Sequence, residues 1–277
     1  MIDASPAHSG ISATAQTSGQ LSISALPGIP LVNPGDDLTG IICDGLQQSG
    51  ITLLDGDILV LAQKIVSKSE GRYAALDSVT PSAAAIELAK EVDKDPRLVE
   101  LILSESKDVV RKRKGVLIVE HNLGIVMANA GIDASNVEPL EGASSTDAKQ
   151  QVLLLPKDPD SSCKNLRDRL REKTGADVAI IINDSVGRAW RNGTVGMAIG
   201  TAGIDALLDL NGRPDLFDRP LQATQVGLAD ELASAASIVM GQADEGRPAV
   251  HIRGYAAKTG HGNAQDLIRA QEQDLFR

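Results

Sequence analysis

Short apolar runs and segments of helical periodicity alternate along most of the chain. An apolar run of about five residues, rich in Val, Ile and Leu and bounded by turn residues, is typical of a buried strand. On this pattern we predict strands over Ile58–Ala62, Val116–Glu120, Gly124–Ala128, Val178–Ile182 and Ala249–Arg253, and a short apolar strand or loop over Leu26–Val32.

Apolar residues spaced by three and four positions predict helices, and capping residues mark where these helices begin. Asp36 or Asp37 can cap a helix that ends near Gly50, and Ile86 is predicted to lie on the inner face of a later helix. Further helices are predicted to open at Thr80-Pro81 and Asp95-Pro96, and to cover Ser161–Thr174, Leu228–Met240 and Ala264–Phe276.

Composition limits the class of protein. Hydrophobic residues make up 42% of the 277 residues, which is enough for the core of one large or two modest domains. The net charge of −10 and the lack of a long basic stripe argue against non-specific binding of nucleic acid. No apolar run is long enough to predict a membrane span. Residues 1–22 lack the pattern of a signal peptide and predict a disordered lead.

Several familiar motifs are absent. The two cysteines, Cys43 and Cys163, form no CxxC pair; this favours a reduced, cytoplasmic setting, with a single disulfide as the alternative. Gly254–Thr259 lacks the glycine that precedes the lysine of a phosphate-binding loop, and no complete dinucleotide fingerprint follows it. The histidines are not spaced as zinc ligands. The sequence therefore gives no support to a zinc hydrolase, a dehydrogenase or a serine esterase.

The most informative segment is Ile180–Gly193, in which an apolar run changes at once to polar residues that include Asp184 and Ser185. A carboxylate and a hydroxyl at the C-terminal tip of a strand are typical ligands for magnesium or manganese. Arg188 and Arg191 follow closely and suit a phosphate or carboxylate substrate. The alternative is a strand that ends in a polar turn and a surface loop.

A second polar segment, residues 63–72, directly follows the predicted strand over Ile58–Ala62 and is predicted to form a polar loop or turn that contains Lys68. Lys68 could supply a point charge to a polyphosphate there, and Ser67 or Ser69 could supply hydrogen bonds. The alternative interpretation is a solvated basic turn.

A third polar segment follows the predicted strand over Gly124–Ala128. Asp133 and Asn136 lie three positions apart in a turn rich in Gly and Ser, so both side chains can face one ligand, although an Asx turn explains the same residues. Two carboxylates after separate strands, together with a basic segment, suit metal-assisted phosphoryl chemistry. The basic run Arg111–Lys114 is interpreted as a solvated face, with the rim of an anionic-substrate site as the alternative.

Five of these segments resemble one protein family in the same order: Pro27–Leu31, Pro34–Asp37, Lys64–Arg72, Ala130–Asn136 and Asn183–Arg191. The family is the coenzyme F-420:L-glutamate ligases, the gamma-glutamyl ligases of deazaflavin coenzyme biosynthesis. The resemblance covers the region 23–277. It implies an α+β fold with mixed sheets in two lobes, with a boundary near residues 156–160, where the sequence looks like a linker. It also implies an intertwined homodimer.

The resemblance implies a GTP-dependent ligase. Such an enzyme activates the carboxylate of the deazaflavin precursor as an acyl phosphate, joins L-glutamate to it, and can add further gamma-linked glutamates. Magnesium or manganese would assist, potassium would activate, and neither nucleic acid nor membrane would be a partner. The resemblance assigns a metal to Asp133, Asp184, Ser185 and Gln225, catalysis to the first two of these, and the nucleotide to Ile29, Pro30, Leu31, Val32, Gln63, Lys68 and Asn136.

Two other functions use the same residues. A metal-dependent phosphotransferase that acts on another small carboxylic acid would need the same metals and the same Lys68. A non-catalytic nucleotide-binding module would need only the nucleotide contacts.

Overall fold

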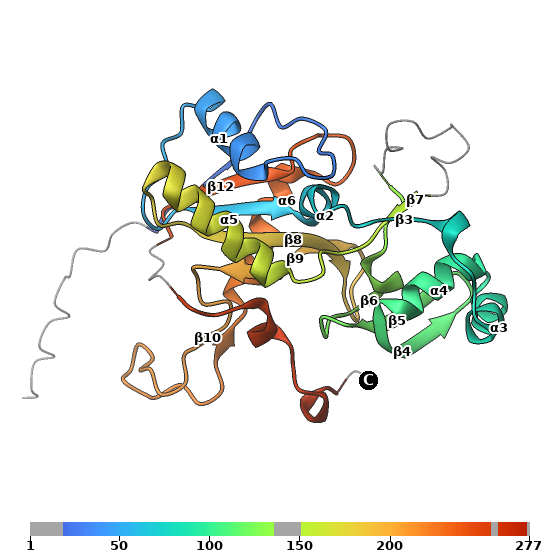
Figure 1. The fold of residues 1–277 in the computed structure, drawn as a ribbon. Coiled ribbons are helices and arrows are strands. Elements are labelled where there is room, and N and C mark those ends of the chain that lie inside the picture. The colour runs from blue at the N-terminus through green and yellow to red at the C-terminus, as the bar shows by residue number, and fades with distance from the viewer. Residues whose placement is uncertain (1–18, 136–150, 256–259, 276–277) are drawn as a thin grey trace, which may run out of the picture.

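The computed structural model describes residues 19–135, 151–255 and 260–275. Its centre is a five-stranded mixed sheet with the strand order β1-β12-β2-β8-β9, in which only β2 and β8 run parallel (Figure 1). The strands of this sheet are β1 (Ser22–Ala25), β2 (Ile58–Ala62), β8 (Ala179–Gly187), β9 (Thr194–Ala202) and β12 (Ala249–Arg253).

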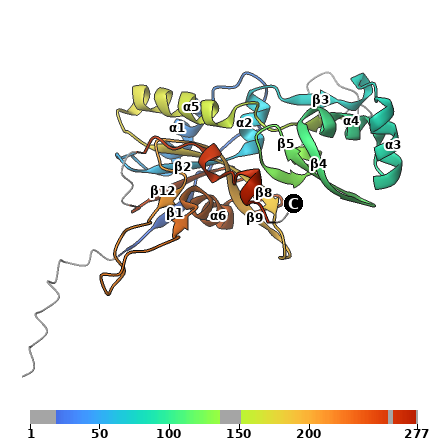
Figure 2. The ribbon, with the colours of Figure 1, turned by 90° about the horizontal axis from the view of Figure 1, so that it is seen from below.

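Helices cover both faces of the central sheet. Figure 2 shows α1 and α5 on one side of the sheet and α6 on the other. The alternation of side chains along a strand explains this arrangement, because Leu59 and Leu61 of β2 pack into one hydrophobic core and Ile58 and Val60 into the other. The helices are α1 (Leu38–Gln48), α2 (Gln63–Ser69), α5 (Pro159–Thr174) and α6 (Leu228–Met240).

Capping residues fix the ends of the helices on the α1 side. The side chain of Asp37 accepts a hydrogen bond from the backbone N–H of Thr39 and caps α1. Asp158 caps α5 in the same way, and Gly175 ends α5 with a left-handed conformation at φ 77°.

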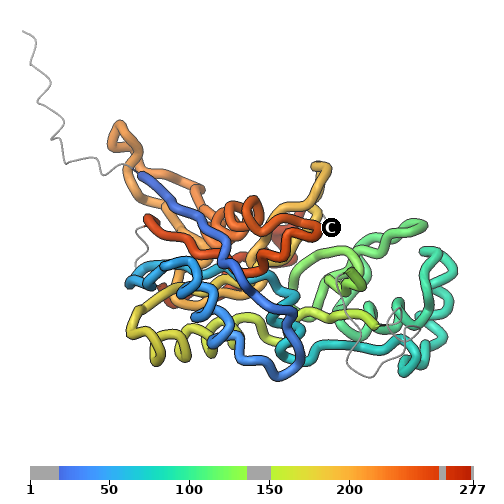
Figure 3. The backbone as a smooth tube through the Cα atoms, turned by 90° about the horizontal axis from the view of Figure 1, so that it is seen from above, coloured from blue at the N-terminus to red at the C-terminus, as the bar shows by residue number. Residues whose placement is uncertain are grey.

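A second group of elements has its own hydrophobic core, which includes Val99, Ile102 and Leu117. It lies to one side of the central sheet, in green in Figure 3. Its members are α3 (Ala83–Val92), α4 (Pro96–Ser104) and the antiparallel sheet of β4 (Ser106–Arg113), β5 (Val116–His121) and β6 (Val126–Ala128).

Two short strand pairs complete the described fold. The strands β3 (Tyr73–Ala75) and β7 (Gln151–Leu153) form one antiparallel pair, and β10 (Leu208–Asp209) and β11 (Gln225–Val226) form the other. Short 3-10 turns cover Leu76–Ser78, Asn129–Gly131, Ala264–Leu267 and Gln271–Gln273. None of the described helices is long and apolar enough to cross a membrane.

Most predicted elements are confirmed. The bounds of β2, β12 and α6 match the sequence prediction, and α1, α3, α4, α5, β5 and β6 differ from it by a few residues. The mixed α and β content is confirmed as well. The division into lobes near residues 156–160 and the homodimer stay predictions, and most of the predicted disordered lead lies outside the described residues.

For Leu26–Val32, predicted as a strand or a loop, the loop is confirmed, and β1 precedes it. Three other local predictions are wrong. Over the described part of the predicted closing helix, the chain instead forms two 3-10 turns, Ala264–Leu267 and Gln271–Gln273. Ile86 is 40% exposed, and Ala85 takes the inner position on α3. Residues 63–69, predicted as a polar turn, form α2.

Candidate functional site

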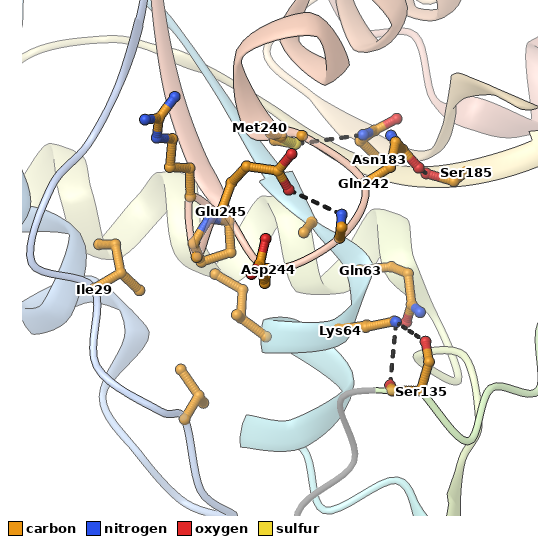
Figure 4. Close-up of a pocket in the computed structure, with 18 of the residues that line it drawn as sticks. Ile29, Gln63, Lys64, Ser135, Asn183, Ser185, Met240, Gln242, Asp244 and Glu245 are labelled. Carbon is orange, nitrogen blue, oxygen red and sulfur yellow. Dashed lines mark hydrogen bonds between the residues drawn. The ribbon is translucent and has the colours of Figure 1, made fainter.

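A pocket of about 530 Å³ opens at the edge of the central sheet where the parallel strands β2 and β8 approach their C-terminal ends (Figure 4). This edge of a parallel pair is a common place for a ligand. Four segments form the walls: residues 29–32, the start of α2, the polar half of β8 and the loop 241–248 between α6 and β12.

Asp184 reaches the pocket from β8. The strand was predicted to end at Ile182, but pairing with β9 continues to Gly187, so Asp184 lies within the strand. Ile182 and Val186, on the same face of β8 as Asp184, anchor it in the core on the α1 side. Burial, and secondarily the negative charge of Asp133, raise the pKa of Asp184 to about 6.

Asp133 lies in the same pocket, and its backbone pairs with Leu153 of β7 through two hydrogen bonds of 2.8 and 3.1 Å. Its carboxylate lies 2.7 Å from Lys64 Nζ and accepts a hydrogen bond of 2.6 Å from the backbone N–H of Ser135. Burial raises the pKa of Asp133, but Lys64 and Ser135 outweigh it and leave the pKa below its ordinary value. The two aspartates, which follow separate predicted strands, thus line one pocket.

Ser185 and Gln242 add neutral oxygen atoms to the site. Ser185 Oγ donates a hydrogen bond of 2.7 Å to Gln242 Oε1, as Figure 4 shows. The structure does not bring Gln225 to this pocket; it lies on β11, where its Nε2 is 3.4 Å from Asp209 Oδ2. Sequence reasoning missed Gln242, because no local pattern shows that the turn after the predicted helix Leu228–Met240 meets Ser185, which is 57 positions away.

The lysines of α2 line one wall of the pocket. Lys64 and Lys68 are four positions apart and therefore lie on the same face of the helix. The prediction that Lys68 lies in a polar loop is wrong, and the solvated-turn alternative is wrong too, because Lys68 is helical and only 8% exposed.

The polar neighbours of Lys68 on α2 are engaged within the helix. Ser67 Oγ donates to Gln63 Oε1 at 2.9 Å, and Ser69 Oγ donates to the carbonyl of Val66 at 2.8 Å. Gln63 lines the pocket, whereas neither serine does; its contact with a nucleotide stays a prediction. Asn136 lies outside the described residues.

The remaining walls differ in character. Residues 29–32 form a mainly apolar wall, and their contact with a nucleotide stays a prediction. The loop 241–248 was not predicted to contribute, yet it brings Asp244, Glu245 and Arg247 to the pocket. Glu245 is held inside this loop by a hydrogen bond of 2.9 Å from the backbone N–H of Ala243.

Two predicted basic segments lie elsewhere. The turn between β8 and β9 carries Arg188 and Arg191 on the surface beside Trp190, which is 86% exposed, and none of the three lines the pocket. The basic run Arg111–Lys114 is exposed, and Lys112 pairs with Glu91 at 2.8 Å. The interpretation of that run as a solvated face is confirmed.

The oxygen atoms of the pocket suit a hard divalent cation. Asp184 makes no ion pair among the described residues, and the same part of the chain contains no cluster of three or more His, Cys, Asp and Glu side chains able to hold a metal. Magnesium and manganese need few protein ligands, because they keep water and bind substrate phosphates. Two carboxylates with the oxygens of Ser185 and Gln242 therefore fit a metal that binds together with a phosphate substrate.

The chain is similar to proteins of one family. The family model described as F420-0:Gamma-glutamyl ligase matches residues 28–254. The coenzyme F420:L-glutamate ligase of Methanothermobacter thermautotrophicus is 45% identical over 93% of this chain and 99% of its own length. The enzyme of the same name from Methanocaldococcus jannaschii is 47% identical over 80% of this chain and 85% of its own length.

A more distant relative shows the same extent of similarity. The coenzyme F420:L-glutamate ligase of Haloarcula marismortui is 36% identical over 93% of this chain and 96% of its own length. The family model and these relatives cover most of the chain, including both carboxylates, the lysines of α2 and the loop 241–248. The chain therefore belongs to the F420-0:gamma-glutamyl ligase family.

Proposed function

We propose that this protein is a GTP-dependent ligase that joins L-glutamate to the carboxylate of the deazaflavin coenzyme precursor and adds further gamma-linked glutamates. The names of its relatives support glutamate ligation. The observation that carries the proposal is the convergence of Asp133 and Asp184 with Lys64 and Lys68 in one pocket at the ends of β2 and β8. Acidic groups for a cation and basic groups for phosphates are the two halves of a nucleotide-triphosphate site.

The nucleotide would lie along the pocket with its two ends in different surroundings. The apolar wall of residues 29–32 suits the base and ribose, and Lys68 on the wall formed by α2 suits the phosphates. A volume of about 530 Å³ is within the range of small-molecule sites and accommodates a nucleotide.

An amide does not form from a carboxylate and an amine unless the carboxylate is first activated. In the proposed reaction a precursor carboxylate oxygen bonds to the γ-phosphorus of GTP, the bond to the β-phosphate oxygen breaks, and GDP leaves. The glutamate amine, having lost a proton, then attacks the carbonyl carbon of the acyl phosphate, and inorganic phosphate leaves. The ammonium groups of Lys64 and Lys68 would hold the phosphates and offset the negative charge that develops on them.

Magnesium or manganese would be held by Asp133, Asp184, Ser185 Oγ and Gln242 Oε1. When bound, such an ion supplies a Lewis acid for the phosphoryl oxygens. This donor set replaces Gln225 with Gln242, which is the glutamine that contacts Ser185. Potassium remains a proposed activator without an assigned site.

We also propose a homodimer. Several large apolar side chains are exposed on the single chain, and such residues gather where proteins associate. They include Leu216, Phe217 and Ile238, which are between 76% and 98% exposed. Light scattering at micromolar concentration tests this, and a monomer would contradict it.

The ligase proposal is tested by incubating the protein with precursor, L-glutamate, GTP and manganese, and analysing the products by mass spectrometry. We expect a precursor extended by glutamate, and GDP released only when glutamate is present. A phosphorylated acid without an amide would favour the phosphotransferase. Nucleotide binding without any turnover would favour the non-catalytic module.

A further inference from the structure

Lys64 takes a place in the pocket that suits a bound cation. Its ammonium group lies 2.7 Å from Asp133 Oδ2 and donates hydrogen bonds to Ser135 Oγ at 2.7 Å and to the Ser135 carbonyl at 3.2 Å (Figure 4). Its positive charge also acts on Asp184. The Lys64 ammonium group is thus paired with Asp133 and has a weaker electrostatic effect on Asp184.

We propose that Lys64 is a resident cation that neutralises Asp133 until a divalent metal ion replaces it, so that metal loading exchanges an ammonium group for a metal ion. The identity of the metal rests on the proposed function. The exchange follows from electrostatics, because an ammonium group and a divalent cation at the same carboxylate oxygen repel each other. Lys64 must therefore leave Asp133 Oδ2 for the metal to bind there.

The helix determines where the displaced ammonium group can go. Lys64 and Lys68 lie on one face of α2 and both line the pocket, so a displaced Lys64 stays beside Lys68. Two lysines at this spacing suit the phosphates of a nucleotide. A nucleotide that attracts Lys64 also removes the competitor from Asp133, so metal and nucleotide should strengthen each other's binding by equal factors.

The test is Lys64→Met, which keeps the length of the side chain and removes its charge. Manganese binding is measured by isothermal titration calorimetry, with and without GDP. Without GDP we expect the variant to bind manganese about fivefold more tightly than the parent, which is the upper end of what a half-exposed ion pair contributes. The gain in manganese affinity on adding GDP should be smaller in the variant than in the parent.

Two further variants complete the test. Lys164→Met removes a lysine from the surface of α5, where it pairs with Asp168 at 2.7 Å, and should bind manganese as the parent does. Lys64→Arg keeps the positive charge, and should bind manganese no more tightly than the parent. This variant also tests the exchange if Lys64→Met does not fold.

Several results would overturn the exchange. The first is a folded Lys64→Met that binds manganese no more tightly than the parent does. The second is a Lys64→Arg variant that binds manganese more tightly than the parent does. The third is that neither the parent nor Lys64→Met binds manganese at all. The ligation assay gives a separate answer on function. If the parent ligates glutamate but Lys64→Met does not bind manganese more tightly, only the exchange is refuted. If Lys64→Met binds manganese more tightly but the parent does not ligate glutamate, only the ligase proposal is refuted.

Discussion

Two aspartates near opposite ends of β2 carry their negative charge in different surroundings. Asp57, directly before β2, is 2% exposed and accepts hydrogen bonds of 2.8 and 2.6 Å from Arg253, with His251 Nε2 at 2.9 Å. Asp184 lies on β8 just beyond the other end of β2, and no cationic side chain among the described residues forms an ion pair with it.

The pKa values of the two carboxyl groups differ accordingly. Burial raises the pKa of Asp57, but hydrogen bonds from Arg253 and His251 outweigh it and leave the pKa below its ordinary value. Burial raises the pKa of Asp184 to about 6, and Asp133 adds to the effect. A carboxylate with cationic partners stabilises the fold. A carboxylate withdrawn from water without such a partner lowers the free energy of unfolding, and a bound cation can offset that loss. On this comparison we expect Asp57 to stabilise the fold and propose that Asp184 binds a cation.

The largest expected effect is on catalysis by Asp184→Asn. This change keeps the shape of the side chain and removes the charge that would hold the metal. We expect kcat/KM for glutamate ligation to fall on the order of a thousandfold, about 4 kcal/mol of transition-state stabilisation. The Tm of the metal-free protein should stay level or rise. Ligation at the parent rate under limiting manganese would show that the metal assignment is wrong.

The next largest effect is expected on stability, at the other end of the sheet. Asp57→Asn leaves Arg253 without its anion. Removing one partner of a buried ion pair costs about 3–5 kcal/mol, and because Arg253 is 39% exposed we expect a loss of about 2–3 kcal/mol. Urea denaturation should show this loss, while kcat/KM of the folded protein stays near the parent value. If Asp57→Asn is as stable as the parent, the distinction between the two aspartates fails.

The sequence revealed Asp184 more readily than Asp57, for a physical reason. A polar residue soon after a buried apolar run is a local signal, and a polar turn after a predicted strand likewise pointed to Asp133. Asp57 gave no such signal, because its partner Arg253 is 196 positions away and no local pattern shows such a contact. Gln242 was missed in the same way, because its link to Ser185 depends on where α6 ends beside β8.

Local patterns also explain which elements were predicted. The strands β2 and β12 are confirmed because each is a short, mainly apolar run with sharp ends, and the helix α6 because its apolar residues keep helical spacing. The extension of β8 to Gly187 was not predictable from its own residues, because β9 provides the pairing that keeps Asp184 and Ser185 in the strand. Lys68 was misplaced because the short helix α2 follows β2 without a turn between them.

A smaller effect should distinguish the basic groups of the pocket from the acidic ones. Lys68→Met removes a charge at the wall that faces the proposed phosphates, and a hydrogen bond to a charged group is worth about 1.5–3 kcal/mol. We expect kcat/KM for GTP to fall roughly tenfold to a hundredfold, with the Tm measured alongside because Lys68 is buried. Lys164→Met is the matched control. An unchanged kcat/KM for GTP would remove Lys68 from the nucleotide site.

The smallest effect expected is on how stability depends on pH. The pKa of Asp184 rises from 3.8 to about 6 on folding, so between these pH values the folded state retains a proton that the unfolded state loses. The free energy of unfolding should therefore fall as pH rises through this window, by about 1–2 kcal/mol once water in the open pocket is allowed for. Asp57 acts in the opposite direction: its stabilisation is present above its ordinary pKa and is lost only as pH falls through the lowered one.

Urea denaturation in EDTA, at a series of pH values from acid to neutral, separates the two contributions. Relative to the parent, Asp184→Asn should gain stability between about pH 4 and pH 6 and keep that gain at higher pH. The deficit of Asp57→Asn should stay constant over the same range, because the lowered pKa of Asp57 places its titration below it. If the difference in the free energy of unfolding between Asp184→Asn and the parent does not vary with pH, folding does not raise the pKa of Asp184. The contrast between the two ends of β2 would then rest on Asp57 alone.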